Sequence, residues 1–330
     1  MSAVQTLTDD AHEDSGTAVV RQLRGDEVAD AERIMRVAFG TFLGFPDPAA
    51  FGGDSDVVGS RWRSDPTRAY ALDVDGCLAG SNLATNWGSF GFFGPLSVAP
   101  AHWGKGLAPL LIERALAAFD AWGCRHAGLY TFAQSAKHHA LYEKFGFFPR
   151  YLTPLLARTT AQPPLGATSP FTRYSTLPAA AQIEVLAECR ALTDAIDEGL
   201  DVTCEVAAVQ RLGLGDTLLV HDDGGLSAFA VCHYGAGTEA GTGNCYVKFA
   251  AARGGVAART RLDAVLAAAE AHALSVHATV VLVGVNTARC EAYTATKARG
   301  YRVQAVGLSM QRPHAEGFNR SGVFILDDWR

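Results

Sequence analysis

A lysine with one glycine on each side offers the clearest chemistry in this sequence. In the segment Trp103-Gly104-Lys105-Gly106-Leu107-Ala108, the small residues would let a ligand approach the backbone closely. The free N–H groups of such a loop, and of the first turn of a helix that follows it, form a site for an anion such as a phosphate. The alternative is a tight turn that binds no ligand.

Two common phosphate-binding motifs do not account for this loop. A P-loop requires G-x-x-x-x-G-K-[ST], and the chain contains no such run. The dinucleotide motif G-x-G-x-x-G also fails, because Pro109 stands where the last glycine would be. The loop therefore has to be interpreted from the elements around it.

The loop connects an expected strand to an expected helix. The apolar run that ends at Val98 indicates a buried strand, which Pro100 stops. Apolar residues then recur at helical spacing between Leu107 and Trp122, and Pro109 suits the first turn of that helix. A strand followed by a glycine loop and a helix is thus predicted.

A second segment of similar character follows. A strand is expected over residues 127–132, and then a helix that begins near Ser135 and ends at Gly146. With the loop, this makes residues 96–148 resemble the acyl-CoA-binding core of the GNAT superfamily of N-acetyltransferases. The family signature L-Y-E-K-x-G-F falls on residues 141–147.

The loop carries the other motif of the family. The pattern Q/R-x-x-G-x-G/A falls on Trp103, Gly106 and Ala108, with tryptophan in place of the usual Gln or Arg. Ser135 likewise replaces the Asn that often opens the later helix. The resemblance implies acetyl-CoA as co-substrate, no metal, and a set of cofactor-binding residues: Leu96, Val98, Trp103, Gly104, Lys105, Gly106, Leu107, Ala108 and Ser135.

The resemblance also implies how these residues act. The pyrophosphate would sit on the N–H groups of residues 104–108, with Lys105 adding positive charge. Backbone groups of Leu96 and Val98 would pair with the pantetheine amides like an extra strand. Tyr142 would be the catalytic residue, as the general acid that protonates the leaving thiolate. Without the motif, Tyr142 would be interpreted as a core aromatic residue.

No general base follows from the motifs. Five titratable residues are available, and a water relay to solvent is equally compatible: Asp47, Asp54, Asp56, His126 and His138. In proteins of this kind the region that corresponds to residues 40–64 covers the acceptor site. The alternative is an ordinary surface loop with aromatic anchors.

The composition favours a soluble globular protein. Of 330 residues, 48% are hydrophobic and 19% charged, and the net charge of −6 argues against nucleic acid as a partner. No apolar run is long enough to span a membrane, and the polar N-terminus does not resemble a signal peptide. The seven cysteines contain no C-x-x-C pair, so we expect a cytoplasmic protein without a zinc or redox motif.

The chain length and an internal repeat of elements predict two domains. We expect a disordered tail over residues 1–16, a GNAT-like acetyltransferase domain over 17–158, a linker over 159–169 and a second GNAT-like domain over 170–330. The predicted fold class is α/β (α+β). Each domain would be a mixed, mainly antiparallel sheet with helices packed on it.

The second half departs from the motifs where chemistry would occur. Val256 stands at the place of the second loop glycine, and Thr296 at the place of Tyr142. We therefore predict that this half is degenerate. The alternative is that Tyr293 and Asn286 serve a second active site.

The sequence predicts an acetyl-CoA-dependent N-acetyltransferase. It would act by direct attack of the primary amine of a small molecule, or of a peptide, as a monomer or a homodimer. Two alternatives remain open at this stage. One is an acyl-CoA-binding regulatory protein without turnover, and the other is a transferase of a larger acyl or aminoacyl group.

Overall fold

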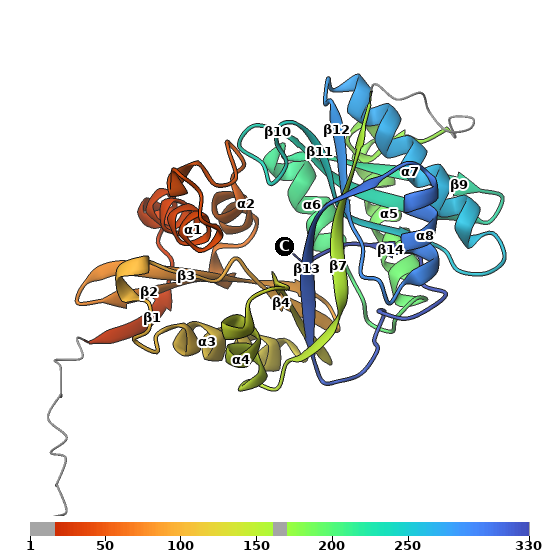
Figure 1. The fold of residues 1–330 in the computed structure, drawn as a ribbon. Coiled ribbons are helices and arrows are strands. Elements are labelled where there is room, and N and C mark those ends of the chain that lie inside the picture. Colours follow the sequence, from red (N-terminus) through yellow and green to blue (C-terminus); the bar gives the residue numbers. More distant parts are fainter. Residues whose placement is uncertain (1–16, 161–169, 330) are drawn as a thin grey trace, which may run out of the picture.

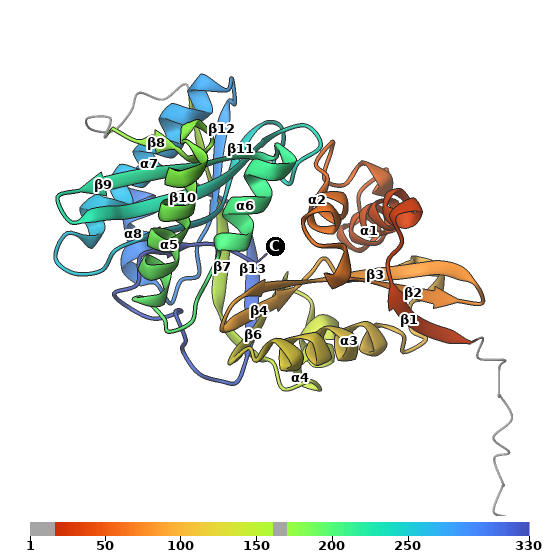
Figure 2. The same ribbon diagram turned by 180° about the vertical axis from the view of Figure 1, so that it is seen from behind.

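The computed structural model describes residues 17–160 and 170–329 (Figures 1 and 2). The expected tail over residues 1–16 and most of the expected linker lie outside the described residues. Within the described part, no helix has both the length and the apolar character needed to cross a membrane.

The first half contains seven strands and four α-helices within its described residues. In chain order they are β1 (Ala18–Gln22), α1 (Val28–Leu43), α2 (Val57–Ser64), β2 (Ala69–Val74), β3 (Cys77–Trp87), β4 (Phe90–Phe93), β5 (Ser97–Val98), α3 (Ala108–Trp122), β6 (His126–Phe132), α4 (Ala136–Glu143) and β7 (Phe148–Thr159).

The second half repeats much of this order. Its elements are β8 (Thr172–Arg173), α5 (Ala179–Asp194), α6 (Thr203–Leu212), β9 (Gly215–Asp222), β10 (Gly225–Gly235), β11 (Gly241–Ala252), α7 (Ala258–Ser275), β12 (Val280–Gly284), α8 (Cys290–Ala298), β13 (Arg302–Arg312) and β14 (Ile325–Leu326).

The two halves share one continuous sheet. Its main strand order is β1-β2-β3-β4-β6-β13-β7-β12-β11-β10-β9-β8. β13, from the second half, lies between β6 and β7 of the first, and β7 pairs with β12 of the second. The last long strand of each half, β7 or β13, therefore pairs with a strand of the other half. The domain boundaries drawn from the sequence remain predictions, because this exchange ties 17–158 and 170–330 into one sheet.

The predicted fold class is confirmed. The sheet is mixed and mainly antiparallel, and the parallel pairs between its described strands are β4 with β6 and β11 with β12. In the first half, α1 and α2 lie over one face of the sheet and α3 and α4 cover the other (Figures 1 and 2). In the second half, α5 and α6 lie on one face and α7 and α8 on the other.

One apolar core crosses the junction between the halves. Trp87 and Phe92 of the first half pack with Phe249 of the second, at ring-centroid distances of 4.8 Å for Trp87–Phe92 and 5.2 Å for Trp87–Phe249. The same core contains the buried faces of α5 and α6. The contact between the halves is thus built like a domain interior, with aromatic rings at its centre.

Some elements differ from those expected from the sequence. Residues 40–64, expected to be irregular, contain α2, because the Asp56 side chain accepts a hydrogen bond of 2.8 Å from the Gly59 N–H and caps that helix. The expected strand over residues 90–98 is divided into β4 and β5 at Gly94-Pro95. β14 was not expected at all.

Candidate active site

The strand that leads into the glycine loop separates from its parallel neighbour. β4 pairs with β6 as far as Phe93 and Leu129. At Gly94 the chain turns toward β3, so that residues 96–98 run beside β3 while β6 continues to Phe132. We call this divergence of residues 96–98 from the end of β6 the first fork.

The backbone groups of the first fork are directed away from β3. The Ala99 N–H donates to the Ala79 carbonyl at 2.8 Å, so Ala99 is a hydrogen-bonded residue of the β3–β5 pair. Hydrogen-bonded positions alternate along an antiparallel pair, so the backbone groups of Val98 and Leu96 face the fork. The Trp103 indole N–H donates a hydrogen bond of 2.7 Å to the Val98 carbonyl, so this carbonyl already has a partner. Among the described residues, the N–H and C=O of Leu96 and the N–H of Val98 have no partner.

The glycine loop presents a row of free donors. Gly104 and Gly106 have φ values of +80° and +70°, which only glycine adopts without strain. Within the described part of the chain, the N–H groups of residues 104–108 have no acceptor. α3 starts at Ala108, so the positive end of its dipole lies at the same place. Lys105 is exposed beside these donors.

Trp103 has a structural role that its place in the motif did not suggest. Besides holding the Val98 carbonyl, its ring lies 5.9 Å from the Lys137 ammonium, measured from the ring centroid. Its side chain is still 39% exposed. Trp103 therefore links the first fork to the start of α4 and leaves a surface on which a ligand could stack.

Ser135 lies at the N-terminus of α4. Its hydroxyl oxygen accepts a hydrogen bond of 3.3 Å from the His138 N–H and caps the helix. The structure thus brings the predicted cofactor-binding residues together along one path, from the first fork through the loop to the start of α4. Their role in binding stays a prediction.

Tyr142 is buried on α4 behind the first fork. Its ring lies 6.0 Å from Phe93 and 6.5 Å from His138, measured between centroids. Burial raises the pKa of the Tyr142 hydroxyl well above its ordinary value of about 10. None of the described residues hydrogen-bonds this hydroxyl. Tyr142 therefore stays protonated at neutral pH and has a proton to give.

The candidate bases are mostly engaged elsewhere. Asp47 and Asp56 cap helical turns, and Asp54 accepts hydrogen bonds from the start of β11. His126 lies against Gln311, at 3.1 Å. Of these candidates, only His138 contacts Tyr142, and its Nδ1 has no partner among the described residues. Burial, chiefly, lowers the pKa of His138, so it is neutral at pH 7.

One residue next to the first fork could not be predicted from the sequence. Arg61, on α2, donates a hydrogen bond of 2.6 Å to the carbonyl of Gly94, where β4 ends. Its ion-pair partner Glu239 comes from the second half, at 3.0 Å. The cap at Asp56 was the signal in the sequence for α2. No local pattern connects Arg61 with a residue so distant in the chain.

The second half forks in the same way, but its own chain fills the fork. β11 pairs with β12 as far as Val247 and Val283, and β10 occupies the other edge of β11. Beyond that point, β14 pairs antiparallel with Ala250 and Ala251. Because β10 holds the first edge, β14 lies on the edge that faces β12. We call this place the second fork. It corresponds to the open edge of residues 96–98 in the first half.

A buried arginine holds the segment that contains β14. Arg289 donates to the carbonyl of Ile325 at 2.9 Å and to the Asp327 carboxylate at 2.6 Å. Arg289 is 0% and Asp327 1% exposed. Val256, expected to obstruct a ligand, points fully into solvent, and Thr296 donates to the Ala292 carbonyl at 2.8 Å. β14 is therefore an obstacle in the second half that does not depend on the loop, and the predicted effect of Val256 stays a prediction.

The described residues contain no group of three His, Cys, Asp or Glu side chains arranged to hold a metal ion. The site consists instead of backbone donors, one buried tyrosine and the cations beside them. Such an arrangement suits an anionic ligand with amide groups, which enters along a strand edge.

Comparison with known proteins agrees with this geometry. The Acetyltransferase (GNAT) family matches residues 39–147, which include the first fork, the loop and Tyr142. No curated protein matches the sequence significantly.

Several solved structures share the fold. A putative acetyltransferase from Pyrococcus horikoshii is 14% identical, with a TM-score of 0.66 over 97% of this chain and 96% of its own. A GCN5-related N-acetyltransferase from Sphaerobacter thermophilus is 16% identical, with a TM-score of 0.56 over 89% and 95%. A tandem GNAT protein from the clavulanic acid biosynthesis pathway is 11% identical, with a TM-score of 0.58 over 89% and 98%. Residues 39–147 therefore match the GNAT acetyltransferase family, and the chain as a whole has the fold of a tandem GNAT protein.

Proposed function

We propose that this protein is an acetyl-CoA-dependent N-acetyltransferase that acts on the primary amine of a small molecule. One observation carries the proposal: the free backbone groups of the first fork lead directly into the free N–H groups of residues 104–108. This order suits the pantetheine amides followed by the pyrophosphate of coenzyme A. The match of residues 39–147 to the Acetyltransferase (GNAT) family supports the same assignment.

The transfer needs one proton donor on the enzyme. The amine nitrogen attacks the thioester carbon, a C–N bond forms, and the C–S bond breaks. The thiolate sulfur takes the proton of the Tyr142 hydroxyl, and the proton lost by the amine passes to water, from which Tyr142 is reprotonated before the next turnover. A backbone N–H of residues 96–98 would stabilise the oxyanion that forms meanwhile. No general base is assigned.

The residues around Tyr142 favour a short acyl group. Phe42, on α1, lies 4.9 Å from both Phe132 and His138, measured between ring centroids. These rings pack between α1, the end of β6 and α4, beside Tyr142. We therefore propose an acetyl group rather than a longer acyl chain. Thiol release from acetyl-CoA and from longer thioesters, with a panel of amines, tests the proposal.

Replacing Tyr142 with phenylalanine should lower kcat about 100-fold, because a general acid acts mainly in the transition state. The affinity for acetyl-CoA should change little, since the hydroxyl has no partner among the described residues. Steady-state kinetics and calorimetric titration measure the two effects. Phe147→Leu, in the same core, is the matched packing control. An unchanged kcat in Tyr142→Phe would mean that Tyr142 is not the general acid and serves only in the packing of the core.

We expect one coenzyme A per chain. The second fork is filled by β14, so its strand edge has no free groups for pantetheine. A calorimetric titration with coenzyme A should therefore give a stoichiometry near one molecule per chain. A stoichiometry near two would refute both this expectation and the proposed degeneracy of residues 170–330.

A further inference from the structure

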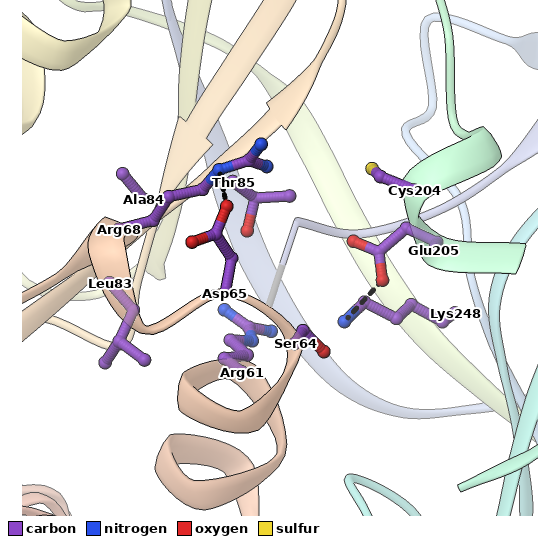
Figure 3. Close-up of a pocket in the computed structure, with 10 residues that line it drawn as sticks. All are labelled: Arg61, Ser64, Asp65, Arg68, Leu83, Ala84, Thr85, Cys204, Glu205 and Lys248. Atoms are coloured by element: carbon purple, nitrogen blue, oxygen red, sulfur yellow. Dashed lines mark ion pairs between the residues drawn. The ribbon is translucent and has the colours of Figure 1, made fainter. Parts of the chain in front are cut away.

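A cavity lies at the junction of the two halves. Its volume is about 90 Å³, several times what one water molecule needs. The lining residues come from α2 and β3 with the turn between α2 and β2 in the first half, and from α6 and β11 in the second (Figure 3): Arg61, Ser64, Asp65, Arg68, Leu83, Ala84, Thr85, Cys204, Glu205 and Lys248.

The cavity adjoins the first fork. Arg61 lines the cavity and donates to the Gly94 carbonyl at 2.6 Å. The Gly94 N–H in turn donates to the carbonyl of Leu83, another lining residue, at 2.8 Å. Gly94 is the residue at which the chain leaves β4 for the fork. The cavity and the first fork therefore meet at the turn of Gly94.

The carboxylates of the cavity are already satisfied. Asp65 accepts from the Thr67 N–H and hydroxyl through one oxygen and pairs with Arg68 at 2.6 Å through the other. Glu205 accepts from the Trp87 indole at 3.0 Å and pairs with Lys248 at 3.3 Å. Each oxygen of these two carboxylates therefore already has a donor or a cation of the protein beside it.

The cations of the cavity, by contrast, keep spare donors. The Nε atom of Arg68 pairs with Asp65, and the guanidinium carbon lies 5.1 Å from the centroid of the Trp122 ring. The two terminal nitrogens of Arg68 have no hydrogen-bond partner among the described residues. Lys248 pairs with two glutamates and so retains one of its three N–H groups. Two cations that line the cavity thus keep free donors.

A buried ion-pair network fixes the donors in place. Glu239 pairs with Arg61 at 3.0 Å and with Lys248 at 2.5 Å, and all three side chains are 6% exposed or less. Since Arg61 is on α2 and the other two belong to the second half, the network spans the junction. The second half thereby contributes to a site next to the first fork, although its own fork is filled.

We propose that the cavity binds the carboxylate of the acceptor, so that the preferred substrate is an amine that also carries a carboxylate, such as an amino acid. This proposal rests on the proposed acetyltransferase function. An anionic group matches the free donors of the cavity, and the two terminal nitrogens of Arg68 can bind it in a bidentate manner. The second half would then be the part of the chain that selects the acceptor.

Matched pairs of amines test the proposal: glycine with methylamine, β-alanine with ethylamine, and lysine with 1,5-diaminopentane. Thiol release from acetyl-CoA should give a kcat/KM at least about 10-fold higher for a carboxylated member, as expected for one charge-assisted bidentate contact. Arg68→Gln should remove this preference through KM and leave the decarboxylated amines unchanged. Arg68→Lys should restore part of it. The matched control Arg63→Gln, on the exposed side of α2, should have no effect.

Calorimetric titration of the same amines into the coenzyme A complex separates this proposal from the proposed function. If a carboxylated amine binds to the wild-type protein and not to Arg68→Gln, the cavity proposal is supported, whether or not thiol is released. Absence of thiol release with every amine would refute only the acetyltransferase function. Equal turnover of both members of every pair would overturn the cavity proposal and leave the function standing. Equal losses for both members in Arg68→Gln would also overturn it.

Discussion

Replacing Gly106 with valine should weaken coenzyme A binding about 1,000-fold. Gly106 has a φ of +70°, and a valine there would force the loop out of the conformation that directs its N–H groups outward. Losing two or more charge-assisted hydrogen bonds, each worth about 1.5–3 kcal/mol, corresponds to an effect of this size. Calorimetric titration with coenzyme A measures the change.

The fold itself should survive this substitution. A Cβ at Gly106 would have no neighbouring atom within 4 Å, so the cost to the free protein is backbone strain alone. Gly255→Val is a matched control, because Gly255 has a φ of +93°, is equally uncrowded and lies in the corresponding loop of the second half. It should leave coenzyme A binding intact. A loss of binding in Gly255→Val, or wild-type affinity in Gly106→Val, would place the cofactor elsewhere.

Lys105 should matter far less than the backbone beside it. The side chain is exposed, so its charge is screened by water and salt. Removing it as Lys105→Ala should cost about 1 kcal/mol of binding free energy, or roughly 5-fold in affinity. The contrast between the two positions tests whether backbone donors, rather than a cation, hold the pyrophosphate.

The elements that local pattern determines could be predicted from the sequence. Pro100, the loop glycines and the helical spacing after Leu107 each restrict the backbone within a few residues, and the structure has the strand, the loop and the helix there. Tyr142 could be named because its motif is contiguous. The position of Tyr142 behind the first fork could not be predicted from a local pattern, because it depends on packing against Phe93 of β4.

The features that depend on distant partners could not be predicted. The place of β13 between β6 and β7 is a choice among strand edges that alternating apolar residues do not encode. β14 has only two residues, too few for a periodic signal. Arg61 and Glu239 are 178 positions apart, and their pairing exists only once α2 lies against the second half. The steric role of Val256 stays a prediction, since the structure shows only that its side chain is exposed.

The segment that fills the second fork leads to the last prediction. Arg289→Met should lower the free energy of unfolding by about 3–5 kcal/mol, because it leaves the buried Asp327 carboxylate without its counter-charge. It also removes the donors to the carbonyls of Ile325 and Asp327. Urea denaturation measures the loss. The exposed pair Arg259–Asp263 provides the control, since Arg259→Met should cost no more than about 1 kcal/mol.

The pH dependence of this loss identifies its cause. Burial already raises the pKa of Asp327, and Arg289 opposes that shift. In Arg289→Met the pKa of Asp327 in the folded state should rise further above its value in the unfolded chain. The deficit is then greatest at neutral pH and shrinks as the pH falls through the raised pKa, because a protonated Asp327 is no longer a buried charge. Adding Asp327→Leu to the variant should recover stability at pH 7 for the same reason. A deficit that is equal at every pH, with no recovery in the double variant, would mean that lost packing rather than an unpaired charge destabilises the second half.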